Sequence, residues 1–121
     1  MVVDQDGRVV CERCLIADTP VARLKGLLGR KELPADEGVL LRPTSAVHTS
    51  FMRFSIDAVF LDGELGVVDV VEGLRPWRAA VRRHARSVLE LAAGEGTRRA
   101  LAPGKRLILV DEGRPPPPRA A

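Results

Sequence analysis

Aromatic side chains are scarce in this sequence. Its 121 residues include no tyrosine, one tryptophan and three phenylalanines. Proteins dedicated to single-stranded nucleic acids usually stack bases on aromatic side chains placed between basic ones. The formal net charge of +3 permits an anionic partner without requiring one. We therefore do not expect a dedicated nucleic-acid binder.

Long apolar runs are also missing. No stretch approaches the roughly 18 apolar residues that cross a bilayer. The opening MVVDQDGRVV lacks both the basic and the apolar region of an export signal. We expect a cytoplasmic protein without a membrane span, in which the two cysteines stay reduced. We expect no cofactor.

The remaining composition suits one globular domain. Hydrophobic residues make up 45% of the chain and charged residues 29%, a balance typical of folded proteins. A chain of this length buries about two-thirds of its unfolded surface, so its core needs no disulfide or metal. We expect a single domain over residues 1–113. The tail over residues 114–121 is expected to be disordered, because its four prolines remove backbone donors.

Most of the local patterns predict strands. The clearest feature is a hairpin, in which Asp62 and Gly63 form a tight turn between two apolar runs. The segment from Leu74 to Arg86 fits either a loop or a helical turn. The predicted strands are Arg8–Ile16, Val39–Leu41, Phe51–Leu61, Val67–Val71, Ser87–Leu91 and Lys105–Asp111.

One helix start is distinct. Asp18 or Thr19 is the predicted N-cap, with Pro20 at the first helical position. Thr97 is the predicted cap of a second short helix. The first helix is expected to end at Gly29 and to present one apolar face, made by Val21, Leu24, Leu27 and Leu28.

Strands outnumber helices in this reading. We therefore predict a mostly β fold with one or two short helices, arranged as a small sandwich or partly closed barrel. Parallel α/β wrapping is not expected, because too few helices are available for the crossovers.

The segment SAVHTSFMRFSIDAVF carries the most information. If it forms one strand, Arg53 and Asp57 share one face. They lie about 13 Å apart along an ideal strand, so each is expected to have its own partner. The structural alternative is a solvated face with a buried Asp57 bonded to the backbone. The core face would consist of Met52, Phe54, Ile56, Ala58 and Phe60.

Two alternatives to a ligand- or protein-binding module have less support in the sequence, namely hydrolysis and anion binding. His48, Ser50 and Asp57 are the residue types of nucleophilic hydrolysis, but the sequence has neither a GxSxG elbow nor a glycine-rich phosphate nest. A basic stretch offers an anion or nucleic-acid site, or simply a solvated surface. It consists of Arg75, Arg78, Arg82, Arg83 and Arg86, with Trp77 and His84 between them.

The two cysteines form the motif CERC. Cys11 and Cys14 have the spacing of half a tetrahedral zinc site, and no second cysteine pair exists. The motif also lacks the strand-to-helix setting of a thioredoxin-like redox pair. We expect no metal, with Cys11 and Cys14 as weak candidates.

Several blocks in order resemble the domain-of-unknown-function 192 family, also called UPF0127-like. The resemblance runs from about Ala17 to Val110 and implies a compact, mostly β domain with jelly-roll-like topology and no established activity. The blocks are RLKGLLGR, EGVLLRPTSAVHTSFMRFSIDAVFLD, SVLELAAG and APGKRLILV.

The resemblance also assigns positions. Asp57 matches the family's signature aspartate. Ser55 replaces a usual proline and Phe51 a usual small residue, so the loop shape is expected to differ here. Arg23, Gly26 and Leu27 match the helix motif, and His48, Thr49, Met52 and Arg53 match one branch of the family.

Together these observations favour a noncatalytic ligand- or protein-binding module. Its partner would be a small molecule, a saccharide or a peptide. The candidate ligand-binding residues are His48, Thr49, Arg53 and Asp57. The alternatives are a small acid–base enzyme that uses His48 and Asp57, and anion or nucleic-acid binding through Arg75–Arg86.

Overall fold

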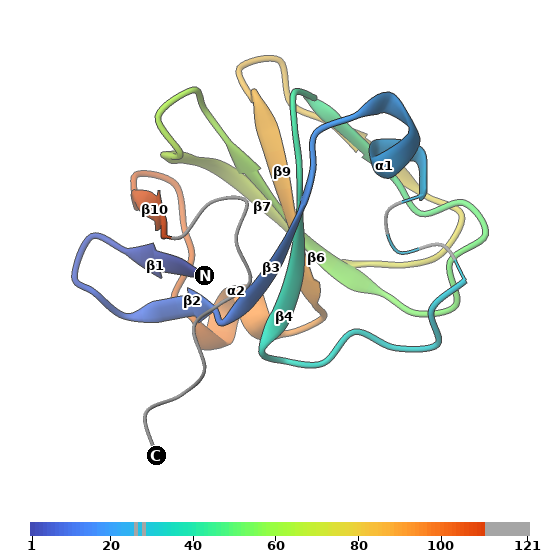
Figure 1. Cartoon of the computed structure of the whole chain (residues 1–121), viewed down its shortest axis with the longest axis horizontal. Helices are drawn as coiled ribbons and strands as arrows, with labels where there is room; N and C mark the ends of the chain where they lie inside the picture. The colour runs from blue at the N-terminus through green and yellow to red at the C-terminus, as the bar shows by residue number, and fades with distance from the viewer. Residues whose placement is uncertain (26, 28, 111–121) are drawn as a thin grey trace.

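The computed structural model describes residues 1–25, 27 and 29–110 (Figure 1). Within these ranges it contains ten strands and two short helices. The strands are β1 (Val2–Asp4), β2 (Val9–Cys11), β3 (Arg13–Ala17), β4 (Glu37–Leu41), β5 (Ala46–His48), β6 (Ile56–Leu61), β7 (Val67–Leu74), β8 (Ala79–Val81), β9 (Ser87–Ala92) and β10 (Leu107–Leu109). The helices are α1 (Pro20–Lys25) and α2 (Glu95–Arg98).

A five-stranded sheet in the order β3-β4-β9-β6-β7 forms the frame of the molecule. Its pairs are antiparallel except β3 and β4, which run parallel and are connected through α1. All six residues of β6 are buried, which explains its nearly continuous apolar run, because both faces of this strand are covered. The prediction of a mostly β fold compatible with a small sandwich is confirmed. The described ranges contain no closed barrel.

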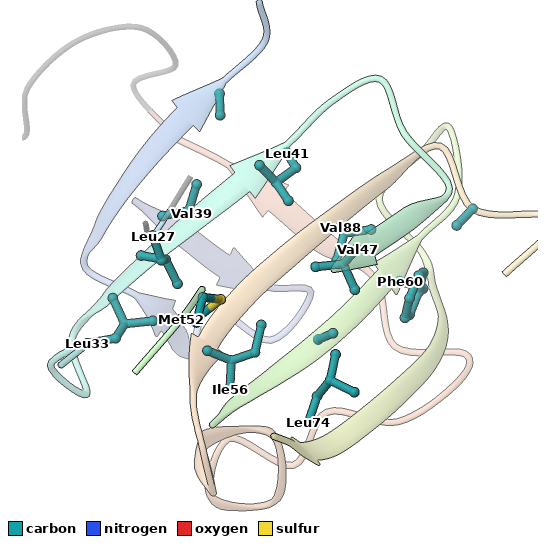
Figure 2. Packing of buried hydrophobic residues seen from close by; sticks show 13 residues of the cluster. Leu27, Leu33, Val39, Leu41, Val47, Met52, Ile56, Phe60, Leu74 and Val88 are labelled. Carbon is teal, nitrogen blue, oxygen red and sulfur yellow. The ribbon is translucent and has the colours of Figure 1, made fainter. Parts of the chain in front are cut away.

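Two hydrophobic clusters cover the two faces of this sheet. Along β6, Ile56, Ala58 and Phe60 belong to the first cluster, while Val59 and Leu61 belong to the second. The second cluster joins the sheet to the three-stranded sheet β10-β1-β2, which lies on the opposite side from α1 (Figure 1). The first cluster includes Leu27, Leu33, Val47 and Met52 (Figure 2).

The predicted core face of the segment around β6 is confirmed, but the strand is shorter than expected. Met52 is buried in the first cluster, and Phe54 packs partly against it. The strand begins only at Ile56. Phe51 has a φ of 65°, and this left-handed conformation is incompatible with an extended strand.

Two further strands differ from the sequence prediction. The expected strand over Arg8–Ile16 is divided into β2 and β3 by a bend at Glu12. The ambiguous segment from Leu74 to Arg86 contains β8, which pairs antiparallel with β5 in a separate two-stranded sheet. Short strands of this kind carry too few residues to show a clear period.

The N-cap predicted from the sequence is confirmed for α1 but not for α2. The Ala22 N–H donates to Thr19 Oγ1 over 3.1 Å, which confirms Thr19 as the N-cap of α1. Thr97 lies inside α2 instead of capping it, because Gly94 takes the N-cap position with a φ of 95°. This left-handed conformation suits glycine.

Some sequence predictions fall partly or wholly outside the described residues. Leu27 is buried as expected, whereas Val21 is 75% exposed and does not join the core. Gly26, Leu28 and the tail over residues 114–121 lie outside the described ranges. Among the residues that the structure describes, no helix has the length and hydropathy needed to cross a membrane.

Candidate functional site

Asp57 lies in the middle of a network of backbone donors. Its side chain is fully buried. Oδ1 accepts a hydrogen bond from Gly73 N at 2.9 Å, and Oδ2 accepts two, from Gly94 N at 3.0 Å and Gly96 N at 2.8 Å. The carboxylate therefore fixes the end of β7 and the start of α2 to β6. This arrangement matches the structural alternative for Asp57, a buried aspartate bonded to the backbone.

Thr49 joins two loops at the other end of the candidate site. It is fully buried, and its hydroxyl donates to Arg75 O at 2.5 Å while accepting from Arg78 N at 2.9 Å. The Thr49 carbonyl accepts from Trp77 N at 3.0 Å. These bonds fasten the loop after β5 to the loop before β8.

An exposed aromatic pair lies on these two fastened loops. Phe51 is 70% exposed and Trp77 59% exposed. Their ring centroids are 4.5 Å apart with an interplanar angle of 60°, which is an edge-to-face contact. Both residues have left-handed backbones, with φ of 65° and 63°. Such conformations cost on the order of 1 kcal/mol or more each for bulky residues, and they persist where the surroundings fix them.

The β5–β8 sheet adjoins these two loops, since β5 ends at His48 and β8 begins at Ala79. Val47 and Ala80 are cross-strand partners that face the first hydrophobic cluster. The alternate residues Ala46, His48, Ala79 and Val81 are exposed on the outer side. We call these four residues, together with Phe51 and Trp77, the β5–β8 face.

Arginines are close in sequence to the residues of the β5–β8 face. Arg53, Arg75, Arg78 and Arg83 are exposed. Arg82 differs from them, because its Nε lies 2.6 Å from Asp69 Oδ2 and its guanidinium lies 5.3 Å from the centroid of the Phe60 ring. The hydrogen bond from Arg82 lowers the pKa of Asp69. The basic stretch thus contains one structural arginine and several exposed ones.

The structure brings together only part of the predicted ligand-binding set. His48 is the last residue of β5, and Thr49 and Arg53 lie in the loop that follows. Asp57 belongs to the five-stranded sheet, and its carboxylate faces Gly73 and α2. His48 and Asp57 therefore come from different sheets and have different neighbours. Of the family helix motif, Arg23 donates from Nη1 to the carbonyl of Arg42 at 3.3 Å, and Leu27 is buried.

The sequence analysis did not recognise Phe51 and Trp77 as a pair. Their contact depends on the bonds of Thr49, which join segments 26 and 29 residues apart in the chain. The available signal was a large aromatic residue in each of two polar loops.

A buried carboxylate was also missed. Glu90 in β9 is 2% exposed and lies between its cross-strand neighbours Val39 and Ala58, both members of the first cluster. Burial raises the pKa of Glu90 to about 7. No donor in the described part of the chain bonds to its carboxylate. A single acidic residue inside the apolar run SVLELA was the signal in the sequence.

A cleft of about 470 Å³ lies apart from the β5–β8 face and shares none of its residues. The arginines Arg42 and Arg86 line it together with Asp18 and Asp62. The Asp62 carboxylate accepts from Glu64 N and Gly66 N, and the bond from Gly66 is the largest influence lowering the pKa of Asp62. Acidic and basic groups offset one another here, so the cleft has no clear charge preference.

Metal-binding groups are not concentrated in the described ranges, where no three histidine, cysteine or acidic side chains gather closely enough to hold an ion. Cys11 is buried, Cys14 is half-buried, and both are free thiols. The CERC motif therefore has no third ligand among the residues that the structure places.

Comparison with known proteins identifies relatives of the chain. The sequence pattern of DUF192, described as an uncharacterized ACR, matches residues 1–109. A UPF0127 protein of Pyrococcus horikoshii is 38% identical over 79 residues, which are 62% of this chain and 68% of that protein. A UPF0127 protein of Thermococcus sibiricus is 34% identical over 97 residues, covering 73% of this chain and 60% of that protein.

Two crystal structures resemble the fold. A protein of unknown function from Novosphingobium aromaticivorans has a TM-score of 0.78 at 23% identity, covering 89% of this chain and 81% of that one. A candidate transcription regulator from Sinorhizobium meliloti has a TM-score of 0.74 at 24% identity, covering 88% of each chain. At these identities the likeness shows the fold.

Proposed function

We propose that this chain, which belongs to the DUF192 family, is a noncatalytic protein-binding module whose contact surface is the β5–β8 face. The observation that carries the proposal is the exposed Phe51–Trp77 pair held on two fastened loops. Contiguous exposed apolar groups with a polar rim typically mark interaction sites.

The composition of the face resembles that of protein interfaces. Aromatic residues and arginine are enriched there, and tryptophan and arginine contribute most of the binding energy at many interfaces. Val81 adds a third large apolar side chain, 58% exposed. The exposed arginines next to these residues in sequence favour a partner segment with acidic side chains, because complementary charge aids both encounter and specificity. We therefore propose an acidic peptide segment of another protein as the partner.

The geometry of the face is fixed before binding. The Thr49 hydroxyl and carbonyl hold Arg75, Trp77 and Arg78 in place. A surface that is already ordered loses less conformational entropy on association. In this proposal His48 and Arg53 contact the partner, whereas Thr49 and Asp57 position the loops and strands behind it.

The other two functions receive less support from the same geometry. Acid–base chemistry through Asp57 conflicts with the three backbone donors that already occupy its oxygens. An extended anion along Arg75–Arg86 would have to compete with Asp69 for Arg82, because these two side chains are already paired. A cytoplasmic location stays a prediction of the sequence.

Trp77 provides a direct test, because it is the single tryptophan of the chain. Short displayed peptides selected on the purified protein should be rich in acidic residues and should change the Trp77 fluorescence. The Phe51→Ala variant should bind them about tenfold more weakly, a loss of about 1.4 kcal/mol. Leu15→Ser is the matched control, since Leu15 is 60% exposed on β3, outside the face.

The outcomes separate the possibilities. Equal binding by the Phe51→Ala variant and the wild type would place the peptide elsewhere and refute the proposed face. A library that yields no binder to the folded protein would argue against a peptide partner. Steep loss of binding with salt, together with indifference to Phe51→Ala, would favour the basic stretch as a simple anion site.

A further inference from the structure

The two cysteines lie at the junction between two sheets. Cys11 ends β2 of the three-stranded sheet, and Cys14 lies in β3, the edge strand of the five-stranded sheet. Both side chains belong to the second hydrophobic cluster, Cys11 as a fully buried member and Cys14 as a partly buried one. Two residues separate them in sequence.

The position of Cys11 Sγ can be fixed from three independent neighbours. It lies 3.2 Å from the carbonyl oxygen of Arg13, the residue bonded directly to Cys14. It also lies 3.9 Å from the carbonyl oxygen of Asp36. A Cβ added to Gly38 would be 3.0 Å from this sulfur, and Gly38 is the register partner of Cys14 in the β3–β4 pair. The sulfur of Cys11 is therefore packed beside Cys14.

The two thiols are electrostatically unequal. The hydrogen bond with Cys11 lowers the pKa of Cys14, and the backbone N–H of Leu40 acts in the same direction. The same contact, together with burial, raises the pKa of Cys11. The half-buried thiol is therefore the one that ionises first, and the thiolate is the nucleophile in disulfide exchange.

We propose that Cys11 and Cys14 form a reversible redox pair, which closes an intramolecular disulfide by exchange with a low-molecular-weight disulfide such as oxidised glutathione. The sequence alone disfavoured a redox role, because CERC does not open a helix as thioredoxin-like motifs do. Here the pairing of β3 with β4 and the end of β2 bring the two sulfurs together instead.

The reaction balances in two exchange steps. The Cys14 thiolate attacks one sulfur of oxidised glutathione, which forms a mixed disulfide and releases one glutathione thiolate. The Cys11 thiol then gives its proton to solvent and attacks the Cys14 sulfur, so that the second glutathione leaves as a thiolate. The protein loses two protons and two electrons, and one oxidised glutathione gains them to become two reduced molecules.

The bridge would add a covalent link between two sheets whose backbones are already hydrogen-bonded near Val67, where Val67 N donates to Lys105 O at 2.7 Å and Gly104 N donates to Val67 O at 3.0 Å. Glu12 and Arg13 are the only residues between the two cysteines. Oxidation would therefore fix the end of β2 against the edge strand β3. The proposal concerns this junction and is independent of binding at the β5–β8 face.

The test is a redox titration of the full chain in buffers with graded ratios of reduced to oxidised glutathione. After acid quenching and alkylation, intact mass distinguishes the dithiol, the glutathione adduct and the internal disulfide. We expect a direct change from two alkylated cysteines to none, with loss of two hydrogens. The Cys11→Ala variant should instead accumulate a glutathione adduct on Cys14, because no second thiol resolves it.

A second measurement needs no variant and so remains decisive if Cys11→Ala fails to fold. Brief alkylation of the folded wild type, followed by peptide mapping, should label Cys14 about tenfold faster than Cys11, in line with its exposure and its lowered pKa. Two thiols that stay reduced through the whole titration would overturn the proposal. A glutathione adduct that persists in the wild type, or a disulfide-linked dimer, would overturn it as well.

Discussion

Asp57 Oδ2 and the backbone nitrogen of Gly96 lie 2.8 Å apart in a fully buried environment, although 39 residues separate them in the chain. A Cβ added to Gly96 would lie 3.0 Å from the same oxygen. The contact therefore depends on both partners, the carboxylate and the absence of a side chain opposite it. It connects the most buried strand of the sheet to the short helix α2.

Replacement of Asp57 tests this contact. Asp57→Ala removes an acceptor from three backbone donors at Gly73, Gly94 and Gly96. We expect the free energy of unfolding to fall by about 3 kcal/mol, because bonds to a charged group are lost and buried donors are left unpaired. Urea denaturation of the variant measures the change. Asp6→Ala, at an exposed position, is the control and should shift stability by less than about 0.5 kcal/mol. An unchanged midpoint for Asp57→Ala would refute the role.

The buried Glu90 predicts an unusual dependence of stability on pH. Burial raises its pKa from 4.5 to about 7 in the folded protein. Between these values the folded state keeps a proton that the unfolded chain has lost. The free energy of unfolding should therefore decrease as the pH rises from about 4.5 to about 7, by about 3 kcal/mol in total.

Denaturation at a series of pH values checks this prediction. Glu90→Gln should abolish the decrease, whereas Glu32→Gln, at an exposed position, should leave it intact. Three carboxylates with lowered pKa values, those of Asp4, Asp62 and Asp69, act in a separate window at and below the ordinary aspartate value of 3.8, where stability should fall as the pH falls. A wild-type curve that is flat between pH 5 and 7 would show that Glu90 is not buried in its acid form.

Thr49 provides a test of the two fastened loops. Thr49→Val keeps the shape of the side chain but removes the hydroxyl that bonds to Arg75 O and Arg78 N. We expect a loss of about 1 to 2 kcal/mol in the free energy of unfolding. The emission of Trp77 should also change, since its loop is no longer held. Thr49→Ser retains the hydroxyl and should keep the wild-type emission, so equal spectra for all three proteins would contradict the assignment.

The close packing around Gly38 predicts that a larger side chain at this position destabilises the protein. A Cβ at this position would lie 2.9 Å from the backbone oxygen of Glu90 and 2.9 Å from a methyl carbon of Leu91. Gly38→Ala should therefore lower stability by about 2 kcal/mol, because the strand pair β4–β9 must separate slightly. Gly63→Ala is the matched control, since its nearest neighbour would be 3.9 Å away. Equal melting temperatures for the two variants would show that the sheet relaxes without cost.

The features predicted correctly from the sequence are those set by neighbouring residues. Pro20 follows a threonine whose hydroxyl caps α1, and Asp62 with Gly63 forms the turn between β6 and β7. The alternation of Ile56, Ala58 and Phe60 identified the first core face. Each of these depends on contacts within a few positions, which a local pattern records.

The features that were missed depend on contacts between distant segments. Phe51 leaves the strand pattern because Thr49 is bonded to residues beyond β7. The burial of Glu90 follows from its position between β4 and β6, which are distant in sequence. The partners of Asp57 are backbone groups at glycines, which carry no side-chain signature in the sequence. The position of Cys11 likewise follows from Gly38, which lies 27 residues further on.

The pairing of β1 with β10 has a consequence for synthesis of the protein. Val2 faces Leu109 and Asp4 faces Leu107 across this antiparallel pair. Of these two strands, β1 is made first and must wait for β10, while β3, β4, β6, β7 and β9 emerge from the ribosome in between. The five-stranded sheet can form before β1 acquires its partner. Until then one edge of β1 is uncovered, so a nascent chain stalled before Leu107 should present a site for chaperones that a released chain lacks.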